Sequence, residues 1–187
     1  MKKQEFSEIV DGETISDFSG QDREAVLFRG CTFIDSNLKE ARLIDCVFER
    51  CTFSSVKLDH AVLQVSFVEC KVEGVNFFVA QRTLISLTFK DCLIRFSSFA
   101  TLKLPGVAFT GCTLKNVDFA EANIPGANFS KTEMEDCIFQ STNLSKADFR
   151  GARGYALDPR LNKLIGAHFE MPEVVSLLDV FQLDIEP

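Results

Sequence analysis

The chain has 187 residues, a net charge of −7 and an unusual apolar composition, with 19 Phe, one Tyr and no Trp. This length is enough for one domain with a sizeable core. The negative charge argues against direct binding of nucleic acid, which needs clustered Lys and Arg. Membrane insertion is not expected, because no apolar stretch approaches the roughly 18 residues of a membrane span.

The N-terminal segment is acidic. Residues 1–24 contain seven acidic and three basic residues, and residues 1–15 contain no apolar run of the signal-peptide type. We therefore expect a cytoplasmic protein. Residues 1–15 are predicted to form an N-terminal cap on the domain that follows.

The central part of the chain has a period of five. Every fifth residue from Phe28 to Leu63 is Phe or Leu, and every fifth residue from Phe89 to Phe149 is a large apolar residue. The residue two places before each of these is mostly small, and the other three of each five are mostly polar. This period fits neither a helix nor a strand. It indicates a chain that turns a corner every five residues and points two side chains of each five inward.

A second, longer period supports this interpretation. Leu104-Pro105-Gly106 recurs 20 residues later as Ile124-Pro125-Gly126, and Pro-Gly is the pair that a type II turn prefers. Four corners would therefore close one coil, and stacked coils would share a core. The phase shifts one residue early after Leu63, and about two residues are gained within residues 78–83. We expect a small bulge or loop there.

The repeats resemble those of the pentapeptide-repeat family, whose signature is A-(D/N)-L-x-x. Ala122-Asn123-Ile124, Ala127-Asn128-Phe129 and Ala147-Asp148-Phe149 are close matches, and the resemblance covers residues 16–153. It implies an all-β fold, a right-handed quadrilateral β-helix with four repeats per coil.

Residues 154–187 are expected to form a C-terminal cap and a dimerisation segment. Pro172 suits the first position of a helix, and apolar residues follow it at helical spacing. We predict a short α-helical cap whose apolar side chains exceed what capping requires. The residues predicted to form a homodimer contact are Val174, Leu177, Leu178 and Phe181.

The chain contains no pattern that we interpret as catalytic, metal-binding or cofactor-binding. All seven cysteines fall two residues before a large inward residue, so they are predicted to be small buried fillers. Acidic residues cluster at Glu133, Glu135 and Asp136, but a rod with a filled interior offers no cleft that would raise a pKa for acid–base chemistry. We expect a non-enzymatic protein.

Further details are similar to the quinolone-resistance and microcin-immunity branch of the family, including Leu93-Ile94-Arg95-Phe96 and the Asp158-Pro159 turn. This resemblance implies a dimeric rod that mimics DNA and binds DNA gyrase and topoisomerase IV. The acidic residues expected to contact that partner are Asp118, Glu121, Glu133, Glu135 and Asp136. No face of the second run is uniformly acidic, so the alternative is an interaction or scaffold module for an unidentified protein.

Overall fold

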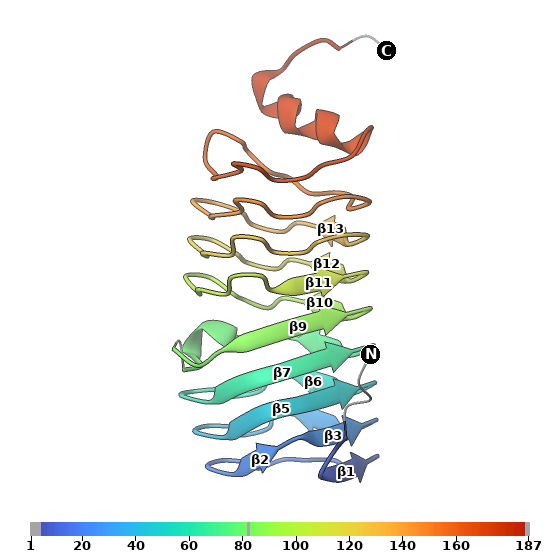
Figure 1. Ribbon diagram of the computed structural model, residues 1–187, viewed down its shortest axis with the longest axis vertical. Coiled ribbons are helices and arrows are strands. Elements are labelled where there is room, and N and C mark those ends of the chain that lie inside the picture. The colour runs from blue at the N-terminus through green and yellow to red at the C-terminus, as the bar shows by residue number, and fades with distance from the viewer. Residues whose placement is uncertain (1–4, 82, 186–187) are drawn as a thin grey trace.

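A computed structural model describes residues 5–81 and 83–185 as a parallel β-solenoid of about six turns. The coils stack into an elongated rod, with β1 at one end and the C-terminal helix at the other (Figure 1). This arrangement follows from the period of five, because a coil that buries only its inward side chains needs neighbours above and below.

Two parallel sheets run along the rod. The first sheet contains β1 (Glu8–Asp11), β2 (Asp22–Glu24), β3 (Val26–Arg29), β5 (Arg42–Glu49), β7 (Val62–Val68), β9 (Ser86–Lys90) and β11 (Ala108–Thr110). The second contains β4 (Thr32–Ile34), β6 (Thr52–Ser54), β8 (Lys71–Glu73), β10 (Leu93–Arg95), β12 (Thr113–Lys115) and β13 (Glu133–Glu135). Within each sheet a strand pairs with strands of the neighbouring coils, and the strands at the sheet ends have one such partner, so backbone hydrogen bonds run along the rod.

The strand register confirms both the 20-residue coil and its two irregularities. Phe89 pairs with Phe109, 20 residues away. Between β5 and β7 the register shifts by one residue, where Ile44 and Cys46 pair with Gln64 and Val65. The next coil then contains two additional residues, and the short 3₁₀ helix η1 (Phe77–Val79) overlaps only the first part of the segment 78–83 in which they were predicted.

The inward positions predicted from the period are buried throughout the two runs. The phenylalanines form columns of stacked rings, and the longest column extends through successive coils with centroid separations of 4.7–5.3 Å. Its members are Phe28, Phe48, Phe67, Phe89, Phe109, Phe129, Phe149 and Phe169. Parallel-displaced stacking adds to the free energy gained from apolar burial.

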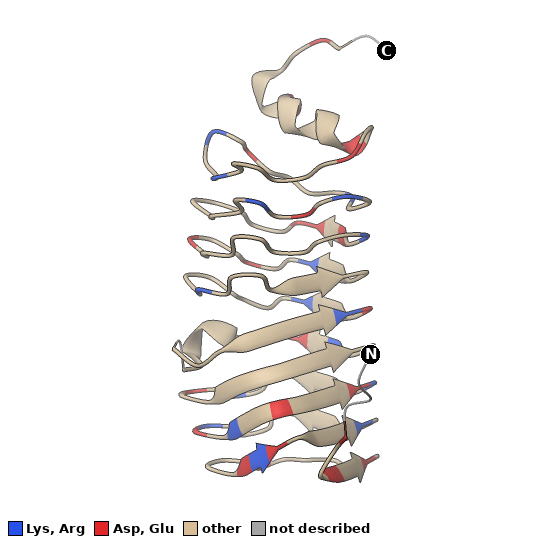
Figure 2. Cartoon of the chain, in the orientation of Figure 1, with Lys and Arg blue, Asp and Glu red and all other residues tan. Residues whose placement is uncertain are grey.

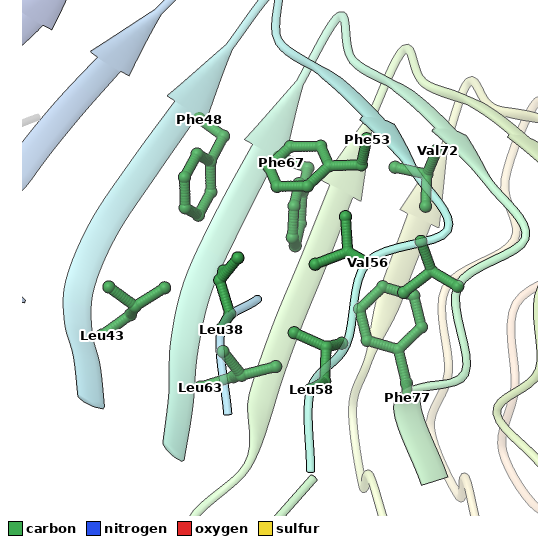
Figure 3. Close-up of a pocket in the computed structure, with 11 residues that line it drawn as sticks. Leu38, Leu43, Phe48, Phe53, Val56, Leu58, Leu63, Phe67, Val72 and Phe77 are labelled. Atoms are coloured by element: carbon green, nitrogen blue, oxygen red, sulfur yellow. The ribbon is translucent and has the colours of Figure 1, made fainter. Parts of the chain in front are cut away.

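A second aromatic column changes position along the rod. In the N-terminal coils it consists of Phe33 stacked on Phe53 at 4.6 Å. From Phe77 to Phe139 the column occupies the next inward position, five residues further along each coil. A cavity of about 20 Å³ lies where the column changes, and Leu58 and Val72 are among the apolar residues that line it (Figure 3).

Tight corners connect the short strands. Gly106 and Gly126 have φ values of 72° and 70°, the left-handed conformation that the third residue of a type II turn requires. The amide of Gly106 donates to the carbonyl of Pro125 at 2.8 Å, so the two Pro-Gly turns stack as predicted.

Small polar side chains at inward positions satisfy buried carbonyl groups. The Thr142 hydroxyl donates to the Phe119 carbonyl at 2.9 Å, and the Cys51 thiol donates to the Phe28 carbonyl at 3.3 Å. Each acceptor lies one coil below the donor. These bonds explain how Thr and Cys can replace Ala or Val inside an otherwise apolar core.

Coil pairing extends into both segments that were predicted as caps. In the N-terminal segment, β1 pairs with β3 in parallel. In the C-terminal segment, Asn143 and Asp148 form parallel bridges with Lys163 and His168. Pairing between coils therefore continues past residues 15 and 153. The division of the chain into two caps and a repeat domain at these residues stays a prediction.

The predicted α-helical type of the C-terminal cap is wrong. The helix η2 (Glu173–Phe181) is a 3₁₀ helix, and Pro172 precedes it rather than occupying its first position. The Ser176 hydroxyl donates to the Glu173 carbonyl at 2.8 Å, and this bond competes with the backbone hydrogen bonds of an α-helix. The β-branched valines of the segment also have a lower α-helical propensity. No helix in the described part of the chain is long and apolar enough to cross a bilayer.

Candidate partner-binding surface

The interior of the rod leaves little room for a ligand. The cavity of about 20 Å³ is entirely apolar in its lining and is close to the size of one water molecule. The outward side chains of the coils therefore form the surface on which a partner can be recognised. Their charges and exposure decide which partners fit.

Three of the predicted acidic residues come together on one strand and its corner. Glu133 and Glu135 point outward from β13, and Asp136 follows at a corner with a φ of 53°. The alternation of side chains along the strand places Met134 inward and exposes both glutamates.

The other two acidic residues lie one coil below, on the next part of the coil. Asp118 is half-buried, pairs in the ladder with Ile138, and accepts a 2.8 Å hydrogen bond from the Ala120 amide. Glu121 is exposed at the following corner, with a φ of 58°. The structure thus spreads the five residues over two coils and does not gather them on one strand.

One acidic side chain of the group is paired with a base. Lys115 on β12 donates to the Glu135 carboxylate on β13, and the two residues are in register. This hydrogen bond lowers the pKa of Glu135, with a smaller contribution from the charge of Arg95. Arg95 on β10 is in register with Lys115 on β12. Two basic residues therefore lie next to the acidic group.

Charge varies along the rod. Residues 5–24 contain seven acids and one base, whereas residues 87–117 contain one acid and four bases. Acidic and basic residues occur together on many of the coils in Figure 2. The described surface therefore combines an acidic N-terminal coil, a basic middle and a more acidic region around β13.

The predicted dimerisation residues have two different environments. Leu177 packs against the hydrophobic core, and Val174 is half-buried. Leu178 and Phe181 are 39% and 47% exposed, and the Arg160 guanidinium lies 5.5 Å from the Phe181 ring centroid. Leu177 therefore packs inward, whereas Leu178 and Phe181 face solvent.

The C-terminal end exposes additional large apolar side chains that the sequence analysis missed. They are Leu161, Ile165, Met171, Leu183 and Ile185, with exposed fractions of 47–72%. The repeat pattern contained a signal for Ile165, because it occupies the outward position that Pro105, Pro125 and Ser145 occupy in the preceding coils.

Phe96 is another exposed apolar residue. It is 59% exposed and has a φ of 49°. The residues at the same corner of neighbouring coils are Ser55, Gly74, Asn116 and Asp136. These residue types tolerate the left-handed conformation better than a bulky aromatic residue does.

A family profile described as pentapeptide repeats matches eight copies in the chain, within residues 27–64, 103–140 and 126–153. No curated protein matches the sequence. The family match therefore rests on the repeats themselves.

Solved structures of QnrB1, a plasmid-mediated fluoroquinolone resistance protein, are similar in fold. One trypsin-treated variant gives a TM-score of 0.65 at 17% identity, covering 95% of this chain and 97% of QnrB1. A second gives 0.63 at 21% identity over the same shares of both chains. The full-length form gives 0.55 at 18% identity, covering 96% and 99%. At this identity the likeness establishes the fold alone.

The stacked coils, the inward phenylalanines and the matched repeats agree with one another. Together they identify the chain as a member of the pentapeptide-repeat family.

Proposed function

We propose that this chain is a non-enzymatic, protein-binding solenoid with a right-handed, four-sided coil, located in the cytoplasm. The observation that carries the proposal is a filled interior combined with a fold similar to QnrB1 over almost the whole of both chains. A rod of this kind recognises its partner through its outer side chains.

The partner that we propose first is a type II topoisomerase, DNA gyrase or topoisomerase IV, bound through DNA mimicry. The DNA-binding surface of such an enzyme is basic because it binds phosphates, so an acidic rod would be steered to it. The acidic N-terminal coil and the group Asp118, Glu121, Glu133, Glu135 and Asp136 supply the negative charge. The biological outcome would be protection against quinolone-type or microcin-type poisons.

The C-terminal end is proposed to join two copies of the chain. Leu178 and Phe181 are exposed there together with the five additional apolar residues named above. An exposed apolar group of this size at one end of a soluble rod is typical of an interface. Two rods joined in this way would form one longer rod, with the acidic regions around β13 of the two copies toward its centre.

The second candidate function is a scaffold for a different protein. Three features favour a scaffold: the excess of basic residues within 87–117, the Lys115–Glu135 ion pair and the exposed Phe96. A DNA mimic needs neither a basic middle nor an exposed aromatic residue. Aromatic residues and Arg are enriched at protein interfaces.

A supercoiling assay of DNA gyrase, with and without a fluoroquinolone, tests the first candidate. The purified protein should inhibit supercoiling or relieve the drug's effect at micromolar concentration. A variant with Glu133→Gln and Asp136→Asn should lose this effect. A control with Asp35→Asn and Glu40→Gln, which removes the same charge from distant corners, should retain it. No effect of the wild-type protein would exclude the topoisomerase partner and leave the scaffold.

Sedimentation velocity tests the dimer. Leu178→Ser combined with Phe181→Ser should convert a dimer to a monomer, whereas Ile34→Ser, at a site 52% exposed on the side of the rod, should not. A wild-type protein that sediments as a monomer at tens of micromolar would contradict the proposal.

A further inference from the structure

Five of the seven cysteines form a single interior column. Each immediately precedes a strand of the second sheet, and these strands pair in register through five successive coils. The column consists of Cys31, Cys51, Cys70, Cys92 and Cys112, all free and 1–2% exposed. It is continuous through both register irregularities of the solenoid.

Backbone and sulfur contacts hold neighbouring members of this cysteine column against each other. The Cys51 and Cys70 amides donate to the Sγ atoms of Cys70 and Cys92, each at 3.4 Å. The Lys71 and Leu93 amides donate to the Cys51 and Cys70 carbonyls, each at 2.9 Å. Neighbouring strands are about 4.8 Å apart, which falls within the Cα separation of about 4.4–6.8 Å that a disulfide accommodates.

The other two cysteines provide an internal comparison. Cys46 pairs in register with Val65, and Cys137 lies one coil above Val117. Both are buried, at 1% and 7% exposure, but neither is stacked on another cysteine. They are as well buried as the column cysteines or nearly so, but they have no cysteine neighbour in the adjacent coil with which to form a disulfide.

The thiols also differ in acidity. Burial raises the pKa of Cys46 and of Cys137. Hydrogen bonds from the Cys112 and Cys70 thiols instead lower the pKa of Cys92. A hydrogen bond from the Cys70 thiol also lowers the pKa of Cys51, whereas the same thiol bonds raise the pKa of Cys70. Because the thiolate is the nucleophile, Cys92 and Cys51 are the members of the column suited to react first, and the steps below are written for Cys92.

We propose that the cysteine column is an oxidation site, at which hydrogen peroxide converts neighbouring thiols of successive coils into disulfides. The Cys92 thiolate attacks one peroxide oxygen, the O–O bond breaks, and the departing hydroxide takes a proton to leave as water. The Cys92 sulfenic acid is then attacked by the sulfur of Cys70 or Cys112. The S–S bond forms, the S–O bond breaks, and hydroxide leaves with the second thiol proton as water. Two electrons pass from the two sulfur atoms to the peroxide.

Each disulfide would join one coil covalently to the next. The cross-link would close a loop of 19 to 22 residues, set by the register between neighbouring coils. A closed loop restricts the unfolded chain, so oxidation should raise the unfolding temperature. Five thiols in one column allow two such cross-links.

Intact mass spectrometry after peroxide treatment and alkylation of the remaining thiols tests the proposal on the folded full-length protein. The wild-type mass should show loss of two hydrogen atoms per disulfide, and peptide mapping should connect neighbouring members of the column. Cys46 and Cys137 should be recovered as alkylated thiols. The unfolding midpoint should rise by about 5 °C or more, and a reductant should reverse the rise.

Two matched double variants separate the column from general thiol reactivity. Cys51→Ala with Cys92→Ala leaves Cys31, Cys70 and Cys112, with no two in adjacent coils, and should form no disulfide. Cys46→Ala with Cys137→Ala keeps the column and should oxidise like the wild-type protein. Disulfides that include Cys46 or Cys137, or a wild-type column that remains reduced, would overturn the proposal. Both observations come from the wild-type protein, so they do not depend on the folding of a variant.

Discussion

The N-terminal and C-terminal coils of the rod both bury their inward side chains, but their strand register differs in regularity. Coils from Ser86 onward repeat every 20 residues, and the Phe99, Phe119 and Phe139 rings stack without interruption. Between Ile44 and Ser86 the register changes twice, and the second aromatic column moves to a different inward position. The apolar cavity lies at that change.

This comparison shows that the period of five determines which side chains point inward, but does not ensure that they fill the core completely. Inward positions are buried equally well in both regions. The cavity forms because Leu58 and Val72 are the residues next to the point where the phenylalanine column is interrupted. A sequence can therefore keep its inside–outside pattern and still leave the core incompletely filled.

The largest expected effect comes from removing a ring in the regular region. Phe119→Ala should lower the free energy of unfolding by about 3–5 kcal/mol, because it leaves a void between the Phe99 and Phe139 rings. Urea denaturation measures the loss. Phe96→Ala, which truncates an exposed Phe, should cost under about 0.5 kcal/mol. Equal costs at the two positions would contradict the assignment of inside and outside.

Enlarging a valine should distinguish the two regions directly. Val117→Ile adds a methylene to a fully packed position and should destabilise the protein by about 1–3 kcal/mol. Val72→Ile adds the same group beside the cavity and should be neutral or slightly stabilising. Thermal unfolding of the two variants measures the difference. The same cost for both would mean that the cavity cannot accept the added methylene group.

Removing a buried hydroxyl should have an intermediate effect. Thr142→Val keeps the shape of the side chain but removes the 2.9 Å hydrogen bond from the hydroxyl to the Phe119 carbonyl, which also accepts the Ala122 amide at 3.0 Å. We expect a loss of about 1–2 kcal/mol by urea denaturation. Thr113→Val, at a half-exposed outward position of β12, is the matched control and should change stability by less than about 0.5 kcal/mol.

The smallest expected effect concerns the ion pair between two coils. Lys115→Ala removes the partner of Glu135 at the surface, where solvent screens the interaction. Stability should change by less than about 0.5 kcal/mol in urea. A loss above about 1 kcal/mol would mean that the pair contributes to coil stacking, in addition to its place beside the candidate partner-binding group.

Much of the architecture could be predicted because one residue spacing determines it. The period of five identifies the inward side chains, and the repeated Pro-Gly pair sets the coil at 20 residues. With that coil length, the contact between Lys115 and Glu135 also follows, because the two residues are one coil apart. The two irregularities were visible as phase shifts near Gln64 and residues 78–83.

The C-terminal end could not be predicted to the same depth. Its apolar spacing fits an α-helix, but the Ser176 hydroxyl donates to the Glu173 carbonyl and the segment forms a 3₁₀ helix, with Leu177 packed against the core. The exposure of Met171 and Leu183 depends on how this segment lies across the rod, and the repeat carries no information about that contact. The division of the candidate acidic group, by contrast, follows from the 20-residue coil, which assigns Asp118 and Glu121 to a different face from Glu133, Glu135 and Asp136.

The uniform 20-residue spacing of the later coils makes them interchangeable modules. Residues 103–122 and 123–142 occupy equivalent positions, and each presents the same ladder of backbone groups to its neighbours. A gene that gains or loses one such 20-residue coil would lengthen or shorten the rod, and the contacts between the remaining coils would stay the same. The irregular coils around Gln64 do not have this freedom, so evolution of the molecule's length is expected to be concentrated in its C-terminal half.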